Sequence, residues 1–272
     1  MKVGVFVDVA NIAMNGGRGM RYDTLHAFAC RGAATALRLN AYVSFDPEMA
    51  TMDSSYKDGQ LRFHSALRDL GYKVILKEVK WYIDKETGEK YGKANADLDL
   101  AVDALLQSGS LDRVVLATGD GDFVQVVKAL QNKGCRVEAT AFDNVSGDLR
   151  QEVDVFTSGY LVPGLLPIAR EREGVQKWGA GGFVRGVLYA HDQLKSYGWM
   201  RYLKTVDGKL WLTDSRNNDS PYQSVFCHDT EMPADFDRGG YANRNSVFEF
   251  RVDADEEGRL KASDVTMIKA KT

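Results

Sequence analysis

The sequence contains few cysteines and prolines and lacks a long apolar run. It has three cysteines and five prolines in 272 residues, and no run of eighteen apolar residues. A transmembrane helix needs about 20 such residues, and Asp8 interrupts the apolar start before a signal peptide could form. We therefore expect a cytoplasmic protein without membrane association. The cysteines match no zinc spacing and lie in or beside apolar segments, so we expect buried reduced thiols and oxygen ligands for any metal: Cys30, Cys135 and Cys227.

A strongly basic segment is also lacking. The formal net charge is −3, with 19 Lys+Arg against 22 Asp+Glu in residues 1–168 and 16 against 16 in the remainder. A polyanionic partner would therefore have to be held by local patches, because no whole-domain field attracts it. The composition, 44% hydrophobic and 27% charged, is globular, and the length suits two domains of about 100–150 residues.

The first part of the chain alternates short β-branched runs with helical patterns. Such a βαβ series predicts an α/β fold, a Rossmann-like central parallel sheet with helices on both faces and the ligand crevice at the carboxyl ends of the strands. The expected strands are 2–8, 41–45, 72–79, 113–118 and 136–142, and the expected helices are 23–40, 54–71, 96–109 and 122–134.

The second part of the chain is rich in aromatic residues and turn signals. A glycine-rich stretch predicts a linker at 169–183, which separates a first domain at 1–168 from a second at 184–272. Short strands in the second domain indicate a small antiparallel barrel. These strands are expected at 186–191, 197–205, 209–214, 224–229 and within 246–265.

Acidic residues collect at one predicted edge of the first domain. Asp8 closes the first strand, Asp120 and Asp122 follow the strand at 113–118, and three more acids begin a helix: Asp97, Asp99 and Asp103. Each acid alone has an ordinary explanation as a turn residue, a helix cap or a solvated charge. Together they would repel one another unless cations neutralise them, and oxygen-only sites of this kind suit Mg²⁺ or Mn²⁺.

These residues resemble the NYN (LabA-like) domain of the PIN-like nuclease superfamily. The resemblance spans roughly residues 2–160 and lies in four segments in a fixed order: VFVDVANI, KANADLDLAVDAL, VVLATGDGDF and SGDLRQEVDVF. It implies a metal-dependent ribonuclease that cleaves phosphodiester bonds by water attack. The implied catalytic and metal-binding residues are Asp8, Asp97, Asp120 and Asp122, and the supporting residues are Asn11, Asp99, Asp103 and Thr118.

Two assignments within this resemblance stay open. Asp97 has the family's six-residue spacing to Asp103, but Asp99 precedes the same helix and competes for the metal-facing role. Three cations, Lys93, Arg18 and Arg21, are candidate contacts for the RNA backbone, although ordinary exposed cations would look the same.

Alternate residues of a strand share a face, so Tyr197 pairs with Trp199 and Phe226 with His228. Exposed rings on neighbouring strands would form a platform for unpaired bases, whereas Gly198, Met200, Val225 and Cys227 suit the interior. The segments KSYGWM, which begins at Lys195, SVFCHDTEM and VFEFRVDADEEGRLKASDV resemble a divergent cold-shock domain of the OB-fold type. The resemblance implies single-stranded RNA as a partner, but Ala190, His191 and Asp229 replace expected aromatics, so the barrel is alternatively an interaction module.

Three functions are therefore compared. A Mg²⁺- or Mn²⁺-dependent endoribonuclease with an RNA-binding barrel fits the complete acidic set. The alternative is a non-catalytic RNA-binding or regulatory protein that keeps the fold, and self-association is open in both. A haloacid dehalogenase phosphatase is disfavoured, because its chemistry needs a second aspartate where this chain has Ala10.

Overall fold

The computed structural model describes residues 1–83, 85, 87–94, 96–169, 177–206, 208–234 and 246–268. The chain forms two compact units. The first comprises residues 1–18 and 25–157, and the second comprises residues 19–24 and 158–272. None of the helices in these described stretches is both long and apolar enough to cross a membrane.

The first unit is built on a six-stranded sheet with the order β3-β2-β1-β6-β7-β8. The pairs β1 with β2, β2 with β3, β1 with β6, and β6 with β7 are all parallel. The α/β class and the central parallel sheet predicted from the sequence are therefore confirmed. The strands are β1 (Lys2–Asp8), β2 (Thr35–Phe45), β3 (Lys73–Glu78), β6 (Arg113–Ala117), β7 (Arg136–Ala141) and β8 (Val155–Ser158).

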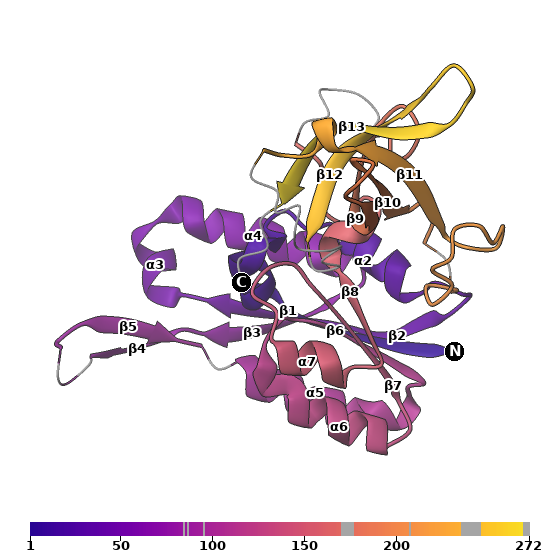
Figure 1. The fold of residues 1–272 in the computed structure, drawn as a ribbon. Coiled ribbons are helices and arrows are strands. Elements are labelled where there is room, and N and C mark those ends of the chain that lie inside the picture. Colours follow the sequence, from indigo (N-terminus) through magenta and orange to yellow (C-terminus); the bar gives the residue numbers. More distant parts are fainter. Residues whose placement is uncertain are drawn as a thin grey trace. The chain divides into compact units, whose positions relative to one another are not determined.

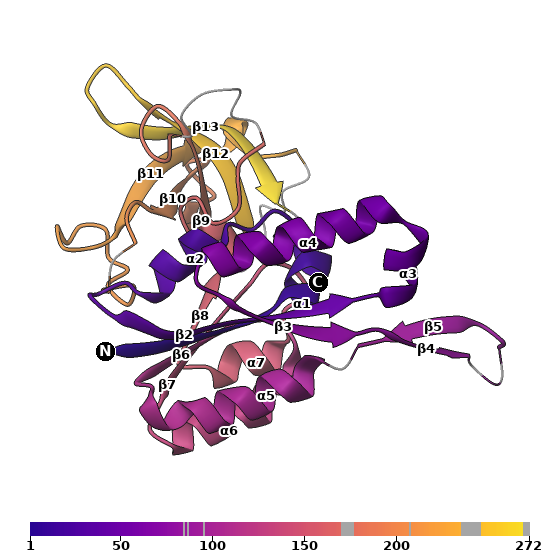
Figure 2. The same cartoon turned by 180° about the vertical axis from the view of Figure 1, so that it is seen from behind.

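Helices cover both faces of this sheet, with α5, α6 and α7 on one face and α2 and α4 on the other (Figures 1 and 2). This double cover explains why β1 and β6 are almost continuously apolar, since neither face meets water. Fully buried side chains such as Phe6, Leu100 and Leu116 fill one of the resulting layers. The helices are α1 (Val9–Ile12), α2 (Tyr22–Ala29), α3 (Pro47–Met52), α4 (Ser54–Asp69), α5 (Ala96–Gln107), α6 (Val124–Asn132) and α7 (Gly147–Glu152).

The helix predicted over 23–40 is wrong in its second half. It ends at Ala29, Ala33 adopts a left-handed φ of 58°, and Thr35 begins β2. The backbone of residues 35–42 pairs with β1, with one irregularity at Leu37, and this ladder outweighs the weak helical spacing of the leucines. Sequence patterns also missed the antiparallel hairpin of β4 (Lys80–Ile83) and β5 (Lys90–Lys93).

The second unit contains a closed five-stranded barrel with the strand order β10-β11-β13-β12-β9. This architecture is consistent with an OB-like fold. The four residues predicted to face its interior, Gly198, Met200, Val225 and Cys227, are indeed buried. The strands are β9 (Phe183–Asp192), β10 (Tyr197–Leu203), β11 (Tyr222–His228), β12 (Val247–Ala254) and β13 (Leu260–Ile268).

The strand predicted at 209–214 is wrong, because these residues form turns and leave Trp211 73% exposed. The predicted linker, 169–183, lies partly outside the described residues, at 170–176. Its later part packs as barrel structure, since the Trp178 indole donates to the Leu203 carbonyl at 2.7 Å and Gly181 N–H donates to Val252. Residues just before β9 therefore already form hydrogen bonds with β12.

All three cysteines are free thiols. Cys135 and Cys227 are buried as predicted, while Cys30 is only half-buried. Burial, with help from Glu231 and Asp229, raises the pKa of the Cys227 thiol to about 12. The Cys227 thiol is accordingly protonated and unreactive at neutral pH.

Candidate active site

Asp8 is the last residue of β1 and lies at the carboxyl edge of the sheet. Its side chain is only 5% exposed. One oxygen accepts the Asn11 backbone N–H at 3.0 Å and so caps α1, and the other accepts the Thr118 hydroxyl at 3.4 Å. The carboxylate is therefore buried at a strand end, where two donors among the described residues face it.

The segment TGDGDF follows β6, which pairs with β1 so that Ala117 lies beside Val7. Thr118 accepts the Asp120 N–H at 3.2 Å, and Asp120 accepts the Asp122 N–H at 2.9 Å as the cap of a short 3₁₀ turn. A Cβ at Gly121 would lie 2.7 Å from the Ser146 hydroxyl, so only glycine fits there. The segment is thus a hydrogen-bonded turn, and its backbone fixes the Cα positions from which the side chains of Asp120 and Asp122 extend.

Asn11 links this turn to the first strand. Its side-chain oxygen accepts the Gly119 N–H at 2.9 Å, across more than one hundred residues of sequence. Together with the bond between Thr118 and Asp8, it joins the ends of β1 and β6 by side chains as well as by the sheet. These two polar residues hold the acidic turn beside Asp8.

Burial is the main cause that raises the pKa of Asp8, and repulsion from Asp97 and then Asp120 raises it further. The bonds from Asn11 and Thr118 act in the opposite direction. Asp97 reaches this edge from the first turn of α5. Asp97 and Asp120, from two separate segments, therefore act electrostatically on Asp8 at this sheet edge.

The two other acids of α5 have partners away from Asp8. Asp99 forms an ion pair with Lys77 of β3 at 2.5 Å. Asp103 accepts the Tyr42 hydroxyl at 2.9 Å, and burial together with this bond raises the pKa of Tyr42. Both side chains thus tie α5 to β2 and β3, whereas Asp97 is the α5 acid that acts on Asp8.

Across the described residues, no group of three or more His, Cys, Asp or Glu side chains is arranged to hold a metal ion. The donor types at this edge nevertheless fit a hard divalent cation, because they are carboxylates that already destabilise one another as anions. A cation would relieve this repulsion. Asp122 is exposed beside Asp120 and offers a further carboxylate.

The predicted backbone cations have different surroundings. Arg18 is exposed directly after the segment 13–17. Arg21, in the second unit, is bound to its neighbour Asp23 at 2.7 Å. Lys93 is the last residue of β5, and its side chain lies outside what the structure describes.

The barrel carries its predicted rings on the outside. Trp199 lies directly opposite Phe226, and Tyr197 opposite His228. The Phe226 ring centroid is 5.4 Å from that of Tyr197 and 5.8 Å from that of Trp199, whose side chain is 41% exposed. Lys195 lies in the turn before β10, with its ammonium 3.7 Å from the Asp192 carboxylate.

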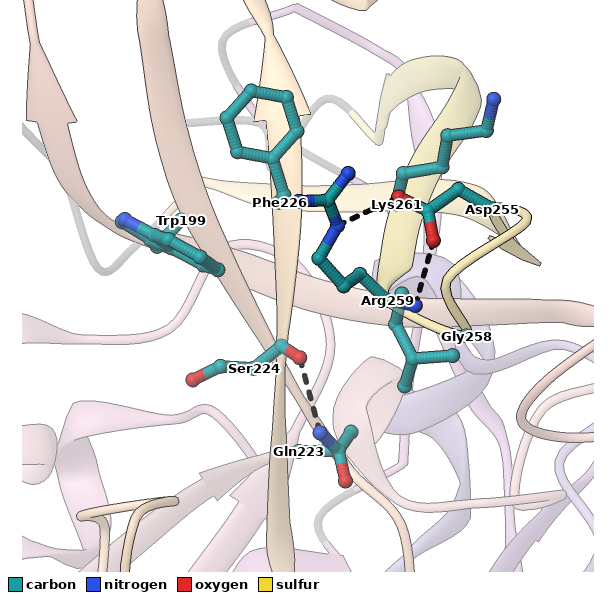
Figure 3. A pocket seen from close by; sticks show the side chains of 9 residues that line it. Trp199, Gln223, Ser224, Phe226, Asp255, Gly258, Arg259 and Lys261 are labelled. Carbon is teal, nitrogen blue, oxygen red and sulfur yellow. Dashed lines mark hydrogen bonds and ion pairs between the residues drawn. The ribbon is translucent and has the colours of Figure 1, made fainter.

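Two of these rings line a cavity of about 800 Å³ (Figure 3). Its wall includes Trp199 and Phe226 together with two cations that sequence reasoning missed, Arg259 and Lys261. Arg259 is held by Asp255 at 2.8 Å and stands in the turn between β12 and β13. A charged turn of this kind has no sequence motif, so its candidate role becomes visible from its position beside the two rings.

Two departures from the cold-shock pattern contact each other. The His191 Nε2 and a carboxylate oxygen of Asp229 are 2.7 Å apart, and both side chains are largely buried. A polar pair therefore occupies the place where aromatic residues were expected.

A doubly wound parallel sheet with carboxylates at its carboxyl edge is the architecture of the PIN-like nuclease superfamily. Within that class the chain belongs to the NYN domain family, which matches residues 2–165. It is similar to the low amplitude and bright protein LabA of Synechococcus elongatus, with 29% identity over 125 residues, 43% of this chain and 67% of that protein. It is also similar to a crystal structure of a protein of unknown function from Vibrio parahaemolyticus, with 27% identity, a TM-score of 0.44, and coverage of 58% of this chain and 91% of that one.

Proposed function

We propose that the protein is a Mg²⁺- or Mn²⁺-dependent endoribonuclease that cleaves single-stranded or flexible RNA. The observation that carries this proposal is the buried carboxylate of Asp8, on which Asp97 and Asp120 from two other segments act repulsively at one sheet edge. A buried carboxylate that is held next to two others weakens the fold, and a cation at that edge would turn the same arrangement into a stable one. Membership of a family within a nuclease superfamily supports the same conclusion.

In this proposal Asp8, Asp97 and Asp120 hold the cation, and Asp122 completes the set. When bound, a divalent cation would polarise the scissile phosphate and lower the pKa of the attacking water. Water adds to phosphorus and the bond to the 3′ oxygen breaks, so the water proton ends on a 3′-hydroxyl and the other product carries a 5′-phosphate. Asn11 and Thr118 act as positioning residues, since they fix the acidic turn against β1.

The barrel in this proposal is a cold-shock-like domain that binds single-stranded RNA. The cavity beside Trp199 and Phe226 combines rings for base stacking with Arg259 and Lys261 for phosphates. The turn between the fourth and fifth strands of an OB-fold is a common nucleic-acid contact, and Arg259 stands in that turn. The small number of rings predicts modest affinity with little base preference.

The test is a time course with end-labelled structured and unstructured RNAs in EDTA, Mg²⁺ and Mn²⁺. We expect metal-dependent internal cleavage by the wild type, and loss of at least 100-fold in rate for Asp8→Asn, Asp97→Asn and Asp120→Asn. Asp58→Asn is the matched control, because Asp58 is an exposed acid of α4 in the same unit. Undiminished metal-dependent cleavage by the three edge variants would refute the proposal.

A second candidate is a non-catalytic RNA-binding or regulatory protein. The ion pair of Asp99 with Lys77 and the bond of Asp103 with Tyr42 favour it, because they give part of the acidic set a purely structural task. RNA binding without cleavage across the same metals and substrates would select this candidate.

A further inference from the structure

The β4–β5 hairpin brings lysines and aromatic residues together, and segment 80–93 carries four lysines against three acids, all three in the connection between the strands. Its eight strand residues include three lysines and three aromatic residues but no acid, although the chain as a whole carries a net charge of −3. Alternating cations and rings are typical of surfaces that bind single-stranded nucleic acid. The residues are Lys80, Trp81, Tyr82, Ile83, Lys90, Tyr91, Gly92 and Lys93.

The hairpin starts from the same sheet edge as the acidic residues. β3 runs parallel to β2 and, through it, to β1, so its carboxyl end lies at the edge that carries Asp8. β4 begins two residues after β3 ends, and the hairpin extends outward from there (Figures 1 and 2). β5 ends four residues before Asp97. The chain therefore leads directly from the hairpin into the candidate active site.

One face of the hairpin is attached to the domain through Trp81. The Trp81 indole N–H lies 3.4 Å from Asp46, the cap of α3, and the Lys90 ammonium lies 4.7 Å from the Trp81 ring centre. Lys90 also pairs with Glu48 at 2.8 Å. A Cβ on Gly92 would come within 3.2 Å of the indole, so glycine leaves room for the ring. The contacts of Trp81 and Lys90 are thus with α3 and its cap.

Two other rings of the hairpin remain exposed. Tyr82 and Tyr91 are direct cross-strand neighbours, with centroids 5.8 Å apart and ring planes inclined by 27°. They are 47% and 51% exposed. The two rings are already stacked on each other and held by the paired strands. Binding of a base would therefore cost little side-chain conformational entropy in the protein.

We propose that Tyr82 and Tyr91 stack on a base of the single-stranded RNA that leads to the acidic edge, and that Lys80 contacts a neighbouring phosphate. This inference rests on the proposed nuclease function and names part of its substrate site. The exposed ring pair with Lys80 in the same strand ladder favours a nucleic acid strand, whose bases stack on rings and whose phosphates contact a cation. The hairpin is thereby one of the local patches that a chain without a basic field requires.

The experiment measures binding of a fluorescein-labelled 12-nucleotide oligouridylate to the full chain in EDTA, by anisotropy. We expect the double variant Tyr82→Ala/Tyr91→Ala to bind at least tenfold more weakly, about 1.4 kcal/mol and within the range for one stacked base. Tyr82→Phe/Tyr91→Phe keeps the rings and should stay within twofold of the wild type. Ile83→Ala is the matched control, since Ile83 is an exposed apolar residue of the same strand.

A second readout is photocrosslinking of the same oligomer with 5-iodouridine, followed by peptide mapping. Crosslinks to Tyr82 or Tyr91 support the proposal. It is overturned if the alanine double variant binds as the wild type does, or if no crosslink falls within 80–93. Sedimentation that changes in the double variant while RNA affinity does not would assign the hairpin to self-association, and would overturn it too.

These outcomes separate the inference from the nuclease proposal. Binding in EDTA is independent of cleavage, so a tyrosine-dependent affinity in a protein that cleaves no RNA would reject the nuclease and keep the hairpin site. Metal-dependent cleavage with an unchanged KM in the alanine double variant would keep the nuclease and reject the hairpin site.

Discussion

Replacing Asn11 by alanine tests whether one side chain holds the acidic turn in place. The change removes the acceptor of the Gly119 N–H, which lies in a buried residue at the end of β6. An unsatisfied buried N–H costs about 1–3 kcal/mol. In a domain of this size each kcal/mol lowers Tm by about 2–4 °C, so a cost near ~2 kcal/mol predicts a fall of about 4–8 °C.

Cleavage should suffer more than stability does. The Gly119 bond sets the start of the turn that carries Asp120 and Asp122, and a misplacement of roughly 1 Å at a catalytic group costs about 100-fold in rate. We therefore expect a kcat reduced by about 100-fold with little change in KM, measured with the RNAs that the wild type cleaves.

Asn217→Ala is the matched control for this experiment. Asn217 accepts the Asp219 N–H at the same 2.9 Å, but at an exposed turn where water replaces the lost acceptor. Its Tm should shift by less than the equivalent of about 0.5 kcal/mol. Equal shifts for the two variants, or full activity in Asn11→Ala, would refute the reasoning about the turn.

Three further predictions concern single side chains. Asp8→Asn should raise Tm at pH 8 while abolishing cleavage: the folded-state pKa of Asp8 lies above its ordinary value, so ionisation costs stability as pH rises. The increase in Tm, measured by calorimetry at several pH values, should become smaller as the pH falls. An increase in Tm that becomes larger at low pH would contradict this prediction. Asp99→Asn should retain most of the wild-type activity, whereas Asp97→Asn should lose it, because Asp99 is paired with Lys77. Equal losses of cleavage rate in the two variants would contradict these separate roles. Phe226→Ala should weaken oligouridylate binding by about 5–100-fold with unchanged Mg²⁺ dependence, and unchanged anisotropy titrations would assign the barrel to another partner.

The main features of the sheet could be predicted because strand ends and apolar runs are local signals. Asp8 stands after a run of apolar residues that only a doubly covered strand needs, so its position at the carboxyl edge follows from the first eight residues. The same logic places Asp120 and Asp122 after β6. The same logic failed for residues 35–40, because they form a strand by pairing with β1, although their own sequence allows a helix.

Side-chain partners were less predictable than positions. Asp97 and Asp99 are two residues apart on one helix and must point in different directions, but the sequence does not say which direction is inward. Lys77 decides it, because its ammonium pairs with Asp99 from β3, which lies two strands away from β1 in the sheet. Arg259 was missed for the same reason, since its importance lies in neighbours that are distant in sequence.

Neither the acidic edge nor the net charge attracts an RNA substrate. Carboxylates that repel one another also repel a phosphate, so without a cation the acidic edge itself adds no attraction for RNA. The chain supplies no long-range attraction to compensate, because neither half is basic. Affinity must then come from short-range contacts next to the edge, and stacking on rings is the contact least sensitive to the sign of the surrounding field. The few lysines are therefore most effective where they accompany exposed rings, as Lys80 accompanies Tyr82 and Tyr91 in β4 and β5.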